Sequence, residues 1–161
     1  MLLPVRRNLL LTISLAWAAC AVARLGLWMA IVPGPVAADW LDAGLSLAAL
    51  MVFGRRALAG LAIGLFVANW LEGVGSLVGF DAAGVRAAAL VTAGELAQAA
   101  LAAWALRSFP RELPRNPVRQ TLRYALIVTL CSLVAASVST LAWATLPVLP
   151  HDEPLFAWVA G

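Results

Sequence analysis

The sequence predicts an all-α fold, a polytopic transmembrane helical bundle of about five spans with its N-terminus in the cytoplasm. Apolar residues fill 63% of the 161 positions and charged residues only 12%, which is far from the composition of a soluble domain. Most of the arginines fall into clusters separated by long apolar stretches: Arg6-Arg7, Arg55-Arg56 and the run Arg107, Arg111, Arg115, Arg119, Arg123. Because cytoplasmic loops of membrane proteins keep an excess of positive charge, each cluster indicates where the chain reaches the inner side.

Five apolar segments approach the roughly 20 residues that a spanning helix needs. They are residues 9–32, 39–54, 57–79, 84–106 and 122–147 of a single membrane domain, 1–161. The first segment follows Arg6-Arg7 and exceeds the about 7–15 apolar residues of a cleaved signal sequence, so we expect an uncleaved helix. The second is short and carries Asp42, which predicts either a tilted helix or one lying partly in the outer interface.

The third segment contains small residues at a spacing of four, Gly60, Gly64 and Ala68. Small side chains let a neighbouring backbone approach closely, so this row predicts a packing seam, either within the protein or between two copies of it. The glycines that follow lower helix propensity, so we expect the regular part of this helix to stop near Glu72.

The fourth and fifth segments are separated by an Arg-rich and Pro-rich stretch, residues 107–121, predicted to be a cytoplasmic loop. An odd number of crossings then places the tail, residues 148–161, on the outer side of the bacterial inner membrane. Trp28, Trp40 and Trp70 fall near the predicted outer boundary and Trp104 near the inner one, as expected of rings that prefer the headgroup level.

Ionisable residues inside a span are costly and usually face a bundle interior, a partner or a water-filled cavity. Here they are Arg24, Glu72 and Glu95. By helical rise Arg24 and Glu95 lie at similar depths, about 12 and 15 Å below the outer ends of their spans. We therefore expect Arg24 to pair with Glu95 or with Glu72; the alternative is that Arg24 extends to the headgroups while both acids face water.

Around Glu95, Thr92 and Gln98 recur at a spacing of three, so one face of the fourth helix carries a polar stripe directed at the other spans. Such a stripe can coordinate a small ligand or hold helices together through hydrogen bonds. Asn69, near the outer end of the third segment, is a separate polar candidate. The candidate ligand-binding residues are therefore Arg24, Asn69, Glu72, Glu95 and Gln98.

Several function classes receive no support from the sequence. We expect neither an enzyme nor a cofactor, because no nucleophile, base and orienting group can be assembled. Cys20 and Cys131 lie in apolar runs and His151 in the tail, so neither a disulfide framework nor a metal site is expected. Nucleic-acid binding is disfavoured because the chain has no lysine and its arginines sit at segment ends rather than along one polar face.

Residues 38–106 resemble a known family, the membrane-associated sensor domain of the first MASE class. The matching positions are Trp40, Gly44, Gly54, Arg56, Gly60, Gly64 and Asn69. Leu41 and Ala59 stand where that family has prolines, and the stretch Ala93 to Ala99 resembles its Gly-Asn-Thr-Leu-Glu-Ala motif, with Glu95 at the Asn position and Gln98 at the Glu position. Family members are typically bundles of about eight helices fused to histidine kinase or diguanylate cyclase domains.

The resemblance implies the sensory input part of a bacterial signalling protein, of the two-component or cyclic di-GMP type. Its expected partners are the lipid bilayer, an output kinase or cyclase in cis or in trans, and a second copy of the chain. The alternative is a transport or substrate-capture membrane subunit, since polar groups at mid-depth also mark permeation paths.

Overall fold

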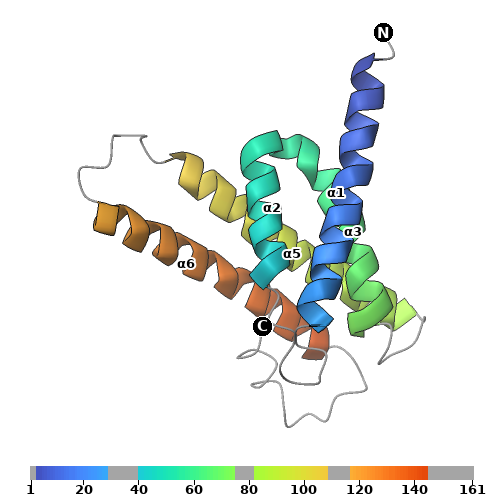
Figure 1. The fold of residues 1–161 in the computed structure, drawn as a ribbon. Helices are drawn as coiled ribbons and strands as arrows, with labels where there is room; N and C mark the ends of the chain where they lie inside the picture. The colour runs from blue at the N-terminus through green and yellow to red at the C-terminus, as the bar shows by residue number, and fades with distance from the viewer. Residues whose placement is uncertain (1–2, 29–39, 75–81, 109–116, 145–161) are drawn as a thin grey trace.

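The computed structural model describes residues 3–28, 40–74, 82–108 and 117–144, and all of these residues are helical (Figure 1). The α-helices are α1 (Leu3–Trp28), α2 (Trp40–Phe53), α3 (Leu58–Ala68), α5 (Ala82–Ser108) and α6 (Pro117–Ala144). A 3-10 turn, η1 (Gly54–Ala57), joins α2 to α3, and a π-helical segment, η2 (Asn69–Val74), continues α3. The predicted all-α class is confirmed for the described residues.

Four helical stretches of the described chain are long and apolar enough to cross a membrane: Arg6–Gly26, Leu41–Leu71, Gly84–Ser108 and Val118–Ala142. The second stretch contains both α2 and α3, and Figure 1 shows that the chain reverses direction between them. The reversal takes place at Gly54, whose φ is 62°. Side chains disfavour that backbone conformation, so a glycine directly after the last turn of α2 allows the chain to fold back.

Helices α1 and α3 run parallel to each other and pack closely. A Cβ atom added at Gly60 would lie 2.7 Å from the Thr12 carbonyl oxygen, and one at Gly64 would collide with the Ala16 carbonyl oxygen. Both glycines are buried. The predicted small-residue seam is therefore a contact within the protein, against α1, where only glycine lets the backbones approach so closely.

Helix α5 is parallel to α2 and antiparallel to α6. Arg107, at its C-terminal end, donates hydrogen bonds to carbonyls in the last turn of α2. A Cβ atom at Gly94 would lie 3.0 Å from the Val138 Cβ, whereas Gln98 lies beside Ser132. Moving toward the C-terminus of α5 therefore means moving toward the N-terminus of α6, as expected of antiparallel helices.

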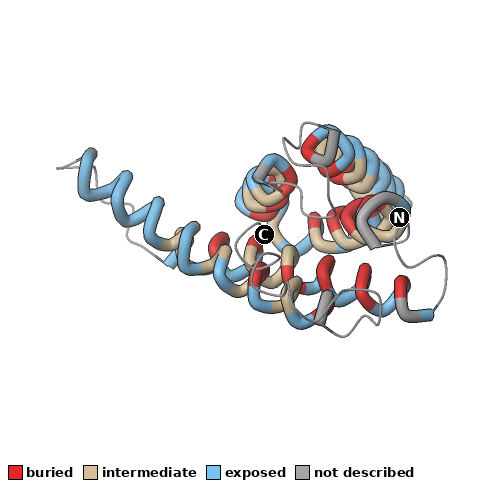
Figure 2. The backbone as a smooth tube through the Cα atoms, turned by 90° about the horizontal axis from the view of Figure 1, so that it is seen from below, coloured by how far each residue is buried: buried red, intermediate tan, exposed pale blue. Residues whose placement is uncertain are grey.

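Helices α1, α2, α3 and α5 form a ring, and α6 packs on the outside of it against α5. Helix α1 packs on α2 and α3, and α5 packs on the same two helices and also on α6. Seen along the bundle, the buried residues of α1, α2, α3 and α5 face one another (Figure 2). Their apolar core consists of Leu15, Ala19, Ala49, Leu50, Ala57, Leu61, Leu65, Ala99 and Ala103.

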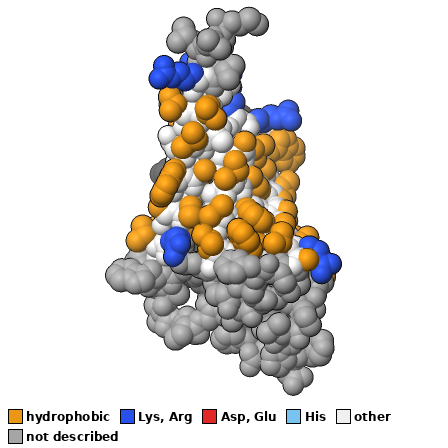
Figure 3. All heavy atoms as spheres, turned by 90° about the vertical axis from the view of Figure 1, so that its right-hand side faces the viewer, with side chains coloured by type: hydrophobic (Ala, Val, Ile, Leu, Met, Phe, Trp, Pro, Cys, Tyr) orange, Lys and Arg blue, Asp and Glu red, His pale blue; other side chains and the backbone are white. Residues whose placement is uncertain are grey.

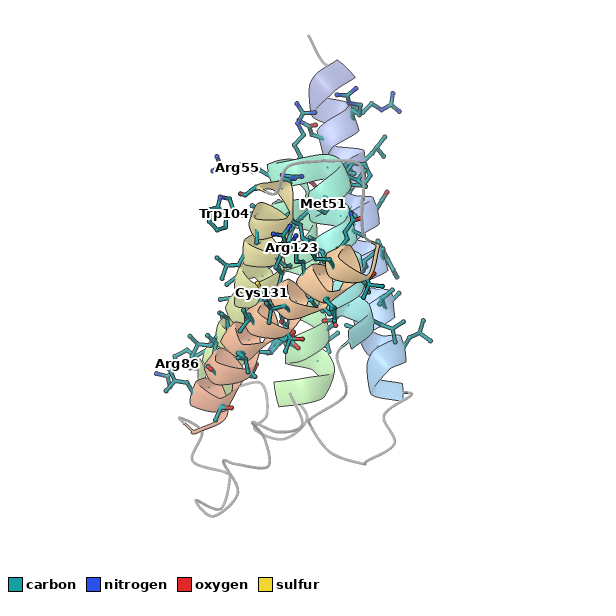
Figure 4. All side chains as sticks on the ribbon, turned by 90° about the vertical axis from the view of Figure 1, so that its left-hand side faces the viewer. Met51, Arg55, Arg86, Trp104, Arg123 and Cys131 are labelled. Atoms are coloured by element: carbon teal, nitrogen blue, oxygen red, sulfur yellow. The ribbon has the colours of Figure 1, made fainter. Side chains whose placement is uncertain are left out.

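Basic side chains gather mainly at the end of the bundle where α1 begins, here named the arginine end. By position, this end holds Arg6, Arg7, Arg55, Arg56, Arg107, Arg119 and Arg123, because α1, α3 and α6 begin there and α2 and α5 end there. Arg55 and Arg86 lie at opposite ends of the molecule (Figure 4). Between the ends, hydrophobic side chains cover the face shown in Figure 3, where no acidic side chain of the described residues is visible.

The observed helix bounds differ from the predicted bounds at three places. The predicted loop at 107–121 is shorter, because α5 continues to Ser108 and α6 begins at Pro117, a residue that suits the first position of a helix. Helix α1 begins at Leu3 instead of residue 9, so the helix includes Arg6-Arg7. Helix α3 ends its regular α-helical part at Ala68 and continues as η2 past the expected end near Glu72. The predicted tail, 148–161, lies outside the described residues.

Candidate functional site: a polar layer inside the bundle

The polar stripe predicted on the fourth span lies on α5 and faces the bundle. Thr92 is 5% exposed, and Glu95 and Gln98 are partly buried. Neighbouring buried residues on the same face, Ala99 and Ala102, are 3% exposed. The stripe therefore belongs to the inward surface of α5.

Asn69 connects α3 to this stripe. Its side-chain Nδ2 donates one hydrogen bond to Glu95 Oε2 at 3.0 Å and another to Thr92 Oγ1 at 3.1 Å. Asn69 is the first residue of η2, and π-helical segments within helices occur frequently at functional sites. Two predicted candidates, Asn69 and Glu95, are thus brought into direct contact.

Gln98 connects the other side of α5 to α6. Its Nε2 donates to Ser132 Oγ at 3.0 Å, and Ser132 in turn donates to the Val128 carbonyl at 2.9 Å. An interhelical hydrogen bond in a membrane bundle contributes about 0.6 kcal/mol on average and up to about 1.7. The polar stripe on α5 is therefore hydrogen-bonded to Asn69, which follows α3, on one side and to α6 on the other.

These contacts lie on the side of the apolar core away from the arginine end, and from Gln98 to Thr92 they extend over about 9 Å along α5. Asn69 is four residues beyond Leu65 on α3, and Glu95 is four residues beyond Ala99 on α5, so each lies about 6 Å past the core. Because α3 and α5 are antiparallel, both steps lead in the same direction. The polar layer is defined here as Asn69, Thr92, Glu95, Gln98 and Ser132.

The hydrogen bonds described above do not involve two further predicted candidates, Arg24 and Glu72. Arg24 is exposed near the C-terminal end of α1. Glu72 belongs to η2, and its side chain lies outside the described residues. The pairing of Arg24 with Glu95 or Glu72 stays a prediction. The third residue of the seam, Ala68, is 1% exposed, one residue before Asn69.

Sequence reasoning did not include Asp42 among the interior polar candidates, because its span was expected to be either tilted or partly in the outer interface. The structure buries Asp42 to 4% exposure on α2, with Oδ1 accepting the Ala43 N–H at 2.7 Å. A signal was present in the sequence. Asp42 precedes Ser46, Ala49 and Leu50 at the spacing of one helical face, and all of them are buried.

The contact made by Arg107 was also missed, because Arg107 was assigned to a solvated loop. Its guanidinium donates to the Met51 carbonyl at 3.1 Å and also to the Leu50 carbonyl. These carbonyls belong to the last turn of α2, where the helix dipole is negative and several carbonyls have no partner within the helix. Arg107 therefore holds the ends of α2 and α5 together.

Comparison with known proteins adds no relative. No family model, no curated protein and no solved structure matches this chain. Among the residues that the structure describes, no three His, Cys, Asp or Glu side chains form a group that could hold a metal ion. The polar layer is the part of the described bundle where polar side chains of different helices contact one another.

Proposed function

We propose that the chain is a sensory input domain of a bacterial signalling protein, embedded in the inner membrane, and that the polar layer is where its stimulus acts. The observation that carries the proposal is the pair of hydrogen bonds from Asn69 to Glu95 and Thr92 in the bundle interior. An ionisable group at that depth is costly and is commonly functional. The sequence resemblance to the MASE sensor family favours sensing among the membrane functions.

We propose five crossings, with the arginine end in the cytoplasm. The directions of α1, α2, α3, α5 and α6 along the bundle support five passes, although α2 has only 14 residues. Loops rich in arginine are retained on the cytoplasmic side. Trp104, which is 70% exposed near this end, has the placement of a headgroup anchor (Figure 4).

The stimulus would act by changing how α5 packs on its neighbours. Helix α5 touches α2, α3 and α6, and it makes side-chain hydrogen bonds at two depths, through Glu95 in the bundle interior and through Arg107 at the arginine end. A ligand that binds one packing arrangement better than another shifts the population between them. A shift of α5 would move its C-terminal end, which lies at the arginine end of the bundle and is followed in sequence by α6. A cytoplasmic output domain would lie on the same side of the membrane.

The proposed partner is an output histidine kinase or diguanylate cyclase, in cis or in trans. The test uses chromosomal variants in the host bacterium, with cellular cyclic di-GMP and kinase phosphorylation as readouts. Asn69→Leu, Glu95→Gln and Gln98→Ala are each expected to hold one readout at a constant high or low level. Thr129→Val, at an exposed position of α6, is the control and should behave as wild type.

Unchanged readouts in all three polar-layer variants, at normal protein levels, would refute the sensor proposal. A transport or substrate-capture role is the second candidate, favoured by the position of a carboxyl group in the bundle interior. It predicts that Glu95→Gln abolishes solute accumulation while both signalling readouts stay unchanged.

A further inference from the structure

The inward face of α2 brings a second carboxyl group toward the polar layer. Asp42 is 4% exposed and Ser46, one turn further along, is 2% exposed. Helix α2 contacts α1 and α5, and the face that carries Asp42 and Ser46 also carries Ala49 and Leu50 of the apolar core. Asp42 and Ser46 therefore point into the bundle and not toward lipid.

Both residues lie at the depth of the polar layer. From Ala49, Ser46 is three residues and Asp42 seven residues back along α2, or about 4.5 and 10.5 Å beyond the core. Glu95 and Thr92 lie about 6 and 10.5 Å beyond it on α5, which runs parallel to α2. By the same helical rise, Asn69 lies about 6 Å beyond the core along α3, which agrees with its hydrogen bonds to Glu95 and Thr92.

Ser46 Oγ is buried and has no hydrogen-bond partner. Other helical hydroxyls in this protein donate to the carbonyl four residues earlier, as Ser132, Ser137 and Thr140 do at 2.9, 2.7 and 2.8 Å. An unsatisfied buried hydroxyl is costly and calls for an explanation such as a bound ion or water. Ser46 thus supplies an oxygen atom that the protein itself does not use.

We propose that a compact cation binds between α2 and α5, held by the carboxyl groups of Asp42 and Glu95 with the hydroxyl oxygen of Ser46 as a neutral ligand. Hard cations prefer oxygen ligands, and a positive charge offsets the cost of carboxylates away from water. The charge can come from an alkali ion or from the ammonium group of a small amine. This inference rests on the proposed role of the polar layer, because it names the ligand class that the layer senses.

The competing source of positive charge is Arg24, which lies near the same end of α1, beside buried Ala23. If Arg24 neutralises Glu95, no external cation is needed at that carboxyl group. The experiment therefore includes Arg24→Gln, and cation binding to this variant should match that of wild type.

The experiment uses the full chain in nanodiscs and dicyclohexylcarbodiimide, a lipophilic reagent that modifies protonated carboxyl groups in apolar surroundings. Peptide mass spectrometry measures modification at Asp42 and at Glu95 separately. The buffers contain sodium chloride, ammonium chloride or methylammonium chloride, each against N-methylglucamine chloride at equal ionic strength. Sodium or the two ammonium ions should protect both residues together, and the protecting ion identifies the source of the charge.

Ser46→Ala keeps both carboxyl groups and should raise the half-protecting cation concentration about fivefold to tenfold, as expected for one lost ligand. Ser137→Ala, which removes an exposed hydroxyl, should leave it unchanged. Equal modification in every buffer, or protection that Ser46→Ala does not weaken, would overturn the cation site. The binding assay needs no output domain. Failure of cation protection would therefore refute the cation site without refuting the sensor proposal, and unchanged signalling in cells would refute the sensor proposal without refuting the cation site.

Discussion

Replacing Gly64 with alanine tests the packing of α1 on α3. A Cβ atom at this position would lie 2.8 Å from the Ala19 Cβ and still closer to the Ala16 carbonyl oxygen, whereas ordinary contacts begin at 3.4 Å, so the helices would have to separate by at least 0.6 Å. Overpacking of this kind costs about 1–3 kcal/mol. Alanine also raises helix propensity by about 1 kcal/mol, which partly offsets the loss.

Gly44→Ala is the matched control. Gly44 lies within α2, and an added Cβ there has nothing within 4 Å, so this variant receives the propensity gain alone. The difference between the two variants isolates the overpacking term, and we expect Gly64→Ala to be about 1–3 kcal/mol less stable than Gly44→Ala. Unfolding in mixed micelles of rising sodium dodecyl sulfate content, followed by tryptophan fluorescence, measures this difference. Equal stability of the two variants would refute the close approach of α1 to α3.

Three further substitutions test the remaining helix contacts by the same unfolding assay. Arg107→Ala removes the hydrogen bonds to the end of α2 and should cost about 1–2 kcal/mol, with Arg107→Lys restoring only part because it keeps the charge but not the planar fork. A double-mutant cycle of Gln98→Ala and Ser132→Ala should give a coupling energy of about 0.6 kcal/mol and at most about 1.7, and zero coupling would contradict their hydrogen bond. Gly94→Leu should weaken the packing of α5 on α6 by about 1–3 kcal/mol, whereas Gly44→Leu, at an exposed position where an added Cβ has no neighbour within 4 Å, should not destabilise.

Apolar run length and residue periodicity were sufficient to predict the helical class, the bounds of two helices and one polar face. Apolar run length predicted α2 and α5 to within two residues at each end, and the spacing of Thr92, Glu95 and Gln98 predicted an inward stripe. Both properties are local, since they follow from helical geometry and from the cost of polar groups in lipid.

Partners between helices could not be predicted, because they depend on which helices are neighbours. The contact of Asn69 with Glu95 needs α3 beside α5, and the contact of Arg107 with α2 needs those helices to run parallel. The orientation of Asp42 was left open for the same reason. A carboxyl group near a span end can face water or the bundle, and only the packing of α2 on α1 and α5 decides between them.

The most direct test of the account is the sidedness of the two ends of the bundle. Single cysteines at Arg55→Cys and Arg86→Cys, both exposed positions, are introduced after Cys20 and Cys131 are replaced by alanine. Intact cells are treated with a membrane-impermeant maleimide. The account predicts labelling of Arg86→Cys from outside and of Arg55→Cys only after permeabilisation. Labelling of Arg55→Cys in intact cells, or of both positions from the same side, would contradict a bundle that crosses the inner membrane with its arginine end in the cytoplasm.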